Sequence, residues 1–280
     1  MAITINTNIS ALSAQTRLSQ SSAQLSGSYE RLSSGLRIVS ASDDAAGLAI
    51  ADGLRADGRI AGVAIRNAND GISLISIADG ALNEIGNVLA RMAELSEQSA
   101  NGTLSDSQRT ALNNEFVALG SEVERIANTT TFNSISLLSG GEEVALQVGF
   151  DSESNSRISI TSVEGTLQSL GLAGSGSSAL NVSLSSAESA RTALDSIQDG
   201  IDSLTATRGT LGAAESRLNV AIANLQVARE NFAAAESQIR DVDVASEAAN
   251  LTRLTILQQA GAAILAQANQ QPGLALALIG

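Results

Sequence analysis

The apolar residues near the start of the chain recur at the spacing of a helix. From residue 5 to residue 39 the large apolar residues recur at heptad-like intervals. The clearest run consists of Leu25, Tyr29, Leu32, Leu36 and Val39. Intervals of four and three residues place side chains on one helix face. The pattern therefore predicts a first helix over residues 5–39 and a polar interruption at residues 40–44, where Ser42 or Asp43 is well suited to cap the next helix.

Two further helices are predicted with the same kind of apolar stripe. The second covers residues 44–99, and Asn101 and Gly102 end it because both residue types tolerate positive φ. The third covers residues 105–128, with Ser105 as its N-cap. The residues expected on the buried faces are Ile75, Leu82, Ile85, Leu89, Met92, Leu112, Phe116, Leu119, Val123 and Ile126. Such stripes indicate helices that pack against other helices.

The period of the pattern changes to two in the middle of the chain. Apolar residues alternate with other residues between Val144 and Phe150, and residues 157–161 alternate again. Alternation of this kind is typical of strands with one covered face. We therefore expect a hairpin that turns at residues 151–156, followed by a flexible Gly/Ser-rich connector at residues 173–178.

A long helical pattern returns after residue 186 and continues to about residue 238, and we expect this helix to lie antiparallel to the second. Residues 240–243 form a polar break. A last helix is predicted from there to Gln271, where Pro272 marks a stop before an apolar tail. The fold class is therefore mainly α: long antiparallel coiled-coil helices formed by the two chain ends, with a small β-hairpin subdomain from the central segment.

The two ends of the chain carry almost no charge. Arg17 is the only charged residue among residues 1–29, and none follows Arg253. A neutral surface with helix-spaced aliphatic residues aggregates or stays unfolded when it stands alone in water. We therefore expect the ends to be disordered in the monomer and helical once other copies bury them. The residues predicted for self-assembly are Ile5, Ile9, Leu12, Leu25, Leu32, Leu36, Leu251, Leu254, Leu257, Ile264 and Leu265.

The composition argues against an enzyme. The chain has no Cys and no His, which removes thiol nucleophiles, imidazole bases and the commonest zinc ligands. Two adjacent acidic pairs remain as candidates for acid/base or metal chemistry. We interpret Asp43 with Asp44 as a helix start, and Glu142 with Glu143 as a turn. We therefore expect no catalytic residue, no metal and no cofactor.

Charge and polarity also limit the partners. The net charge is −13, and every basic residue is an Arg. Phosphate binding needs a basic stripe, so we expect no nucleic acid. Six amide side chains within the uncharged residues 254–280 argue against a membrane span. The first residues lack both a basic segment and an unbroken apolar segment, so we expect no cleavable secretory signal.

Several segments at the two ends resemble bacterial flagellin. The N-terminal signature of that family is matched by residues 5–8 (INTN), 31–38 (RLSSGLRI) and 43–50 (DDAAGLAI). The C-terminal signature is matched by residues 239–243 (IRDVD), 256–261 (ILQQAG) and 265–270 (LAQANQ). Val39 and Ser42 depart from the pattern, because many flagellins have Asn and Lys there. The central segment is short, so we expect no large outer domains.

The resemblance implies a structural subunit that polymerises into the helical flagellar filament for swimming motility. Flagellins are exported unfolded through the flagellar type III apparatus and polymerise at the filament tip, which implies an extracellular location. The implied inner coiled-coil domain comprises residues 1–40 with 241–280. The implied outer-tube helical domain comprises residues 41–130 with 186–240, and the hairpin and connector region at residues 131–185 belongs to it.

The resemblance also implies partners: many copies of the same chain, the flagellar cap protein, hook-filament junction proteins, an export chaperone and the export apparatus. In flagellins detected by the Toll-like receptor for flagellin, three residues dominate the contact, and they fall on Arg91, Leu95 and Glu115 of this chain. Ala93 and Glu97 depart from the usual residues, which predicts weaker receptor binding. Alternatively, Arg91 is a solvated helix charge and Leu95 a packed apolar residue.

Two other functions remain open on the sequence alone. One is a flagellar hook-filament junction protein, which shares flagellin-like ends, and the other is a coiled-coil surface adhesin. Neither forms long filaments alone, so electron microscopy of purified, seeded protein separates them from a filament subunit.

Overall fold

The chain forms two compact units in the computed structural model, which describes residues 7–140, 143–161, 163–174 and 177–279. The first unit comprises residues 1–58 and 230–280, and the second comprises residues 59–229. Two long helices, α2 (Ala45–Ala100) and α4 (Ala187–Arg240), contribute to both units.

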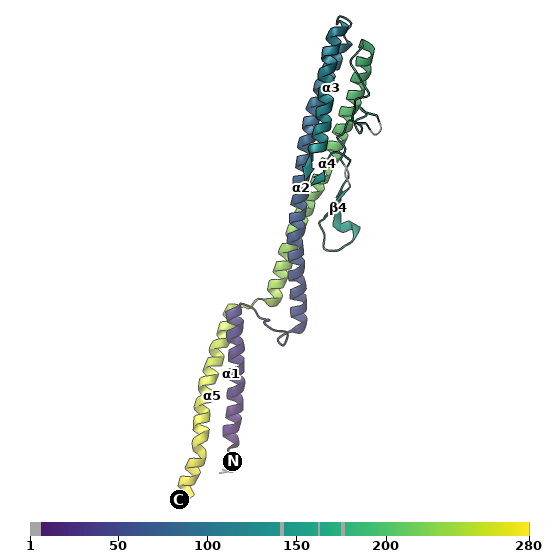
Figure 1. Ribbon diagram of the computed structural model, residues 1–280. Helices are drawn as coiled ribbons and strands as arrows, with labels where there is room; N and C mark the ends of the chain where they lie inside the picture. Colours follow the sequence, from purple (N-terminus) through teal and green to yellow (C-terminus); the bar gives the residue numbers. More distant parts are fainter. Residues whose placement is uncertain (1–6, 141–142, 162, 175–176, 280) are drawn as a thin grey trace. The chain divides into compact units, whose positions relative to one another are not determined.

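In the first unit, α1 (Ile9–Ser34) and α5 (Val244–Ile279) lie side by side (Figure 1). The first helix is shorter than predicted. Gly35 adopts a left-handed conformation with φ 73°, and its N–H bonds to the carbonyl of Arg31 at 2.9 Å. This geometry ends the helix, because the chain leaves the α conformation at the glycine. Leu36 and Val39 therefore lie in the connection to α2.

The last helix is longer than predicted. The expected stop at Gln271 is wrong, because α5 continues through Pro272 to Ile279. A proline inside a helix removes one backbone hydrogen bond, while the other residues keep theirs. The Leu and Ala residues that follow are also strong helix formers. The apolar tail is therefore part of the helix.

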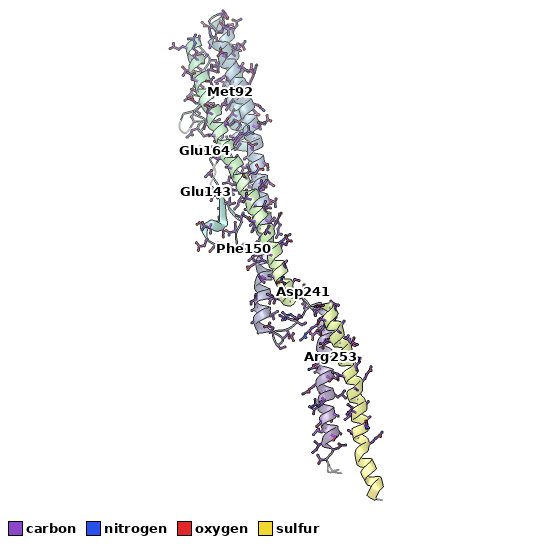
Figure 2. All side chains as sticks on the ribbon, turned by 180° about the vertical axis from the view of Figure 1, so that it is seen from behind. Met92, Glu143, Phe150, Glu164, Asp241 and Arg253 are labelled. Atoms are coloured by element: carbon purple, nitrogen blue, oxygen red, sulfur yellow. The ribbon has the colours of Figure 1, made fainter. Side chains whose placement is uncertain are left out.

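The second unit is built on α2, α3 (Asp106–Thr129) and α4, which lie side by side in Figures 1 and 2. Their bounds agree closely with the predicted helices. The fully buried side chains of this core include Ile75, Leu82, Ile85, Leu89, Met92, Phe116, Val123 and Ile197. The predicted stripes of α2 and α3 are therefore confirmed, with Leu112, Leu119 and Ile126 half-buried at the edge of the core.

Cross-helix contacts confirm that α4 runs antiparallel to α2. Arg208 of α4 pairs with Asp79 of α2, with Nε 2.7 Å from Oδ1, and it also donates to Asn83 Oδ1 at 3.3 Å. A Cβ at Gly86 would lie 3.3 Å from Leu204, whereas one at Gly71 would lie 3.2 Å from Leu218. Later positions on α4 thus meet earlier positions on α2.

A buried arginine fastens the connection between α2 and α3. Ser105 caps α3 as predicted, and Gln108 completes a capping box by accepting from the Ser105 N–H at 2.9 Å. The guanidinium of Arg109 donates to the carbonyl of Ser99, and to those of Asn101 and Leu104 at 3.1 and 3.2 Å. A cation beside the last carbonyls of α2 is also favoured by the helix dipole.

The central segment forms two small antiparallel hairpins. The predicted hairpin is present as β3 (Val144–Gln147) and β4 (Arg157–Ile160), in the register Val144 to Ile160, and the short helix η1 (Ser154–Ser156) lies in its turn. A second hairpin, β1 (Thr131–Phe132) with β2 (Ile135–Ser136), was not predicted. Part of the predicted Gly/Ser-rich connector, residues 175–176, lies outside the described residues.

The central segment is fastened to the helices of the second unit by polar side chains. Asn113 of α3 accepts from the N–H of Leu184 at 2.8 Å, and Ser99 of α2 donates to the Leu184 carbonyl at 3.0 Å. Glu124 accepts from the Leu167 N–H at 3.2 Å. Because these bonds satisfy backbone groups that the irregular chain would leave unpaired, the segment packs as part of the unit.

Candidate self-assembly interface

The two ends of the chain form an antiparallel helix pair. Gln258 of α5 donates to Ser22 of α1 at 3.2 Å, and Ser28 of α1 donates to Glu247 of α5. Asn8, just before α1, donates to the carbonyl of Ala268 at 2.7 Å. These three contacts follow one antiparallel register along the pair.

The buried surface of the pair is small. Its buried residues are Ala14, Leu25, Ser28, Leu254 and Ala268. The helices approach closely, and a Cβ at Gly261 would lie 3.4 Å from the Leu18 side chain. Among the described side chains, two of these residues are large aliphatics, whereas Ile9, Leu12, Leu257 and Ile264 are left exposed.

The residues predicted for self-assembly fall into three groups. Leu25 and Leu254 are buried between the helices. Leu32, Leu36, Leu251 and Leu265 are half-buried. Ile9, Leu12, Leu257 and Ile264 are exposed, and Ile5 lies outside the described residues. Sequence periodicity placed these residues on helix faces without distinguishing the face that meets the other helix from the face that meets solvent.

The exposed apolar face of the pair, defined by Ile9, Leu12, Leu257 and Ile264, is extended by residues that sequence reasoning left out. Val244, Ile256 and Tyr29 are each more than half exposed. Ile256 is adjacent to Leu257, and its position outside the three-and-four spacing hid it. The only charged residues on α1 and α5 are Arg17, Glu30, Arg31, Glu247 and Arg253. A face this apolar and this poor in charge can bind other apolar helices.

Backbone hydrogen bonds join residues 35–37, just after α1, to residues 240–242, just before α5. The Arg37 N–H donates to the Arg240 carbonyl at 2.6 Å, and the Val242 N–H donates to the Gly35 carbonyl at 3.0 Å. Leu36 and Asp241 form an isolated antiparallel bridge, and Figure 2 shows Asp241 at the short connection between α4 and α5. The C-terminal end of α1 and the N-terminal end of α5 are therefore held together by backbone bonds.

The two aspartates of the predicted helix start have separate structural roles. Asp44, not Ser42 or Asp43, caps α2, because its Oδ1 accepts from the Gly47 N–H at 2.9 Å. Asp43 Oδ2 instead accepts from the N–H groups of Val39 and Ser40, at 3.2 and 3.0 Å. Of the other acidic pair, Glu142 lies outside the described residues. Among the residues that the structure describes, no group of three or more Asp or Glu side chains is arranged to hold a metal.

Acid is expected to loosen the connection between α1 and α2. Hydrogen bonds from the backbone lower the pKa of Asp43 below its ordinary value of 3.8; the bond from Ser40 has the largest effect, and the bond from Val39 the next largest. The carboxylate therefore stabilises the connection above the unfolded pKa, and this contribution is lost as the pH falls through the lower folded pKa. Amide proton shifts of Val39 and Ser40, followed by NMR below about pH 5, measure the effect.

An Asp43→Asn variant should abolish this titration, while an Asp70→Asn change on the exposed surface of α2 should leave it intact. Amide shifts that titrate identically in the Asp43→Asn variant would contradict the assignment.

The predicted receptor residues lie at the contact of α2 with α3. Arg91 donates to Glu115 through Nε and Nη2, at 3.1 and 3.0 Å, and to Glu94 at 2.8 Å. Hydrogen bonds raise the pKa of Arg91; the bond to Glu94 has the largest effect, and the bond to Glu115 the next largest. Leu95 is only 1% exposed and belongs to the core. The structure thus brings Arg91 and Glu115 together on the surface and leaves Leu95 no surface of its own for a partner.

No helix among the described residues combines the length and the apolar character that crossing a membrane requires.

Comparisons with known proteins connect this arrangement to filament proteins. Residues 5–143 match the model of the bacterial flagellin N-terminal helical region, and residues 194–279 match that of the C-terminal helical region. A flagellin of Halalkalibacterium halodurans is 43% identical over 281 residues, which cover 98% of this chain and 99% of that protein. The flagellar filament 30.7 kDa core protein of Treponema maltophilum is 39% identical, with 95% and 96% covered.

A solved structure of a protein from Vibrio parahaemolyticus, described as hook-associated, covers 71% of this chain and 100% of its own with a TM-score of 0.58. At 14% identity this likeness shows the fold alone.

Proposed function

The chain belongs to the bacterial flagellin family, and from this premise we propose that it polymerises through its paired ends into a filament that drives swimming. Flagellins are structural proteins of the flagellar filament and not enzymes. The finer steps belong to the proposal: export of the unfolded chain through the flagellar type III apparatus, and addition of subunits at the growing tip.

The observation that carries the proposal is the exposed apolar face of the α1/α5 pair. Its large aliphatic residues project from helices with little charge, and among the side chains that the structure describes the pair buries two large aliphatics of its own, Leu25 and Leu254. Burial of apolar area is the main favourable term in association. Neighbouring copies that cover this face would remove it from water, and the same burial would stabilise the two helices.

We propose the domain roles along the same lines. Residues 1–40 with 241–280 form the inner coiled-coil layer, and residues 41–130 with 186–240 form the outer tube, with the hairpin region at residues 131–185 facing solvent. The α1/α5 pair supports the first assignment. The larger core of the second unit supports the second, because a unit with its own core can keep its fold before assembly.

The proposed partners follow from the family. They are the flagellar cap protein at the growing end, hook-filament junction proteins at the base, and an export chaperone and the export apparatus before assembly. Recognition by the host Toll-like receptor for flagellin is proposed through Arg91 and Glu115, with Leu95 contributing only through the packing beneath them. The filament would lie outside the cell.

The test is self-assembly of the purified chain. Monomer added to short seeds is expected to extend them into long filaments visible by electron microscopy, as neither a junction protein nor an adhesin would do. Hydrogen exchange is expected to show residues 9–34 and 244–270 protected in the filament and unprotected in dilute monomer. Failure of the seeds to grow would remove the proposed function, and protection already present in the monomer would remove the coupling of folding to assembly.

A further inference from the structure

Asn8 makes two hydrogen bonds with the two ends of one carboxamide. Its Oδ1 accepts from the Ala11 N–H at 3.0 Å, which caps the start of α1. Its Nδ2 donates to the carbonyl of Ala268 at 2.7 Å. The second bond joins residues 260 positions apart and reaches a buried residue of α5.

The carbonyl that Asn8 reaches is the one that α5 itself cannot satisfy. In an α-helix each carbonyl accepts from the N–H four residues later, so the Ala268 carbonyl would be paired with residue 272. That residue is Pro272, which has no N–H. A buried carbonyl without a partner costs free energy comparable to a lost hydrogen bond. The Asn8 amide supplies the missing donor.

Asparagine suits both bonds better than the other common N-cap residues. Asp would still cap α1, but its ionised carboxylate has no hydrogen to donate to the carbonyl, and its charge would face the carbonyl oxygen. Ser and Thr have one oxygen, on a shorter side chain, for both tasks. The carboxamide places an acceptor and a donor on separate atoms.

We infer that the Asn8–Ala268 hydrogen bond sets the register of the α1/α5 pair, because Pro272 frees that carbonyl alone. Shifting α5 by one or more residues would present Asn8 with a carbonyl that already accepts from its own helix. The contacts of Ser22 with Gln258 and of Ser28 with Glu247 agree with this register. The inference rests on the proposed function in so far as the filament is where the register matters.

The test is a double-mutant cycle on the critical concentration for filament growth. Asn8→Asp keeps the cap and removes the donor, so it should raise the critical concentration about fivefold or more. Pro272→Ala restores an N–H that can satisfy the Ala268 carbonyl. In that background the effect of Asn8→Asp should therefore be at least threefold smaller. Gln24→Glu introduces the same charge at an exposed position of α1, and it is expected to have a much smaller effect.

The inference would be overturned if Asn8→Asp raised the critical concentration by the same factor with and without Pro272→Ala. It would also be overturned if Asn8→Asp raised the critical concentration no more than Gln24→Glu does. If the Pro272→Ala variant alone fails to assemble, the critical concentrations of the Asn8→Asp and Gln24→Glu variants still test the inference. If the parent chain itself forms no filament, the proposed function falls. The inference then falls with it only if residues 9–34 and 244–270 also show no exchange protection in any state.

Discussion

Replacing Leu257 and Ile264 together by Gln is expected to raise the critical concentration for filament growth by about thirtyfold or more. The two residues lie seven positions apart on one stripe of α5 and are 48% and 58% exposed. Full burial of a Leu or Ile stabilises by about 1.5–3 kcal/mol, so covering the exposed halves of both contributes about 2 kcal/mol to assembly. The critical concentration is measured by sedimentation of seeded filaments.

The control for this variant is Leu254→Ala, which removes a residue buried inside the pair. That change should destabilise the α1/α5 pair itself. The Leu257→Gln/Ile264→Gln variant alters only exposed residues of α5, so the helix content of the second unit should stay unchanged. Growth of the double variant at the parent's critical concentration would show that neighbouring copies do not cover this face.

Replacing Arg109 by Ala is expected to lower the free energy of unfolding of the second unit by about 2–4 kcal/mol. The side chain is only 6% exposed, and its guanidinium serves the carbonyls of Ser99, Asn101 and Leu104. Without it, the Ser99 carbonyl, at the buried end of α2, has lost its donor. Urea unfolding of the monomeric chain, followed by circular dichroism, measures the change.

Two further variants separate the causes of this loss. Arg109→Met keeps most of the buried side-chain volume and removes every donor, so it should lose nearly as much stability as Arg109→Ala. Arg191→Ala removes an exposed arginine of α4 and should change stability little. Stability restored by Arg109→Met would mean that packing, and not the hydrogen bonds, holds the connection between α2 and α3.

The helices could be predicted from sequence because their signals are local. The stripe that contains Phe116 repeats at helical spacing, and Ser105 with Gln108 forms a capping box within four residues. The β3–β4 hairpin showed itself through alternation over several residues. The family resemblance was carried by short segments at both ends, and the comparisons confirm it.

Other features could not be predicted because their partners are distant in sequence or too short to form a pattern. The sequence analysis did not single out Arg109, because its partners are backbone carbonyls, which leave no sequence signal. The β1–β2 hairpin has two-residue strands, and its turn places Asn133 and Ser134 at φ 48° and 67°, without a glycine to mark it. Pro272 was expected to end the last helix because a proline has no N–H for the carbonyl four residues before it. That carbonyl, of Ala268, instead accepts from Asn8, which is 260 positions away in the sequence.

At the candidate interface, too, local spacing could be predicted from sequence, whereas contacts between distant residues could not. Apolar spacing identified which residues share a helix face, but it treated Leu25 and Leu12 alike. The structure buries Leu25 against α5 and leaves Leu12 exposed. The difference depends on where the two helices touch, which in this pair follows from small residues and polar contacts such as that of Ser22 with Gln258.

The backbone bonds between Arg37 and Arg240 and between Val242 and Gly35 have a mechanical consequence. They cross from the outgoing chain to the returning chain where the helix pair begins. A tensile force applied to either terminus is therefore divided between the two polypeptide segments at this point. In a filament whose subunits are joined in this way, load on each subunit would be carried by two covalent segments at once.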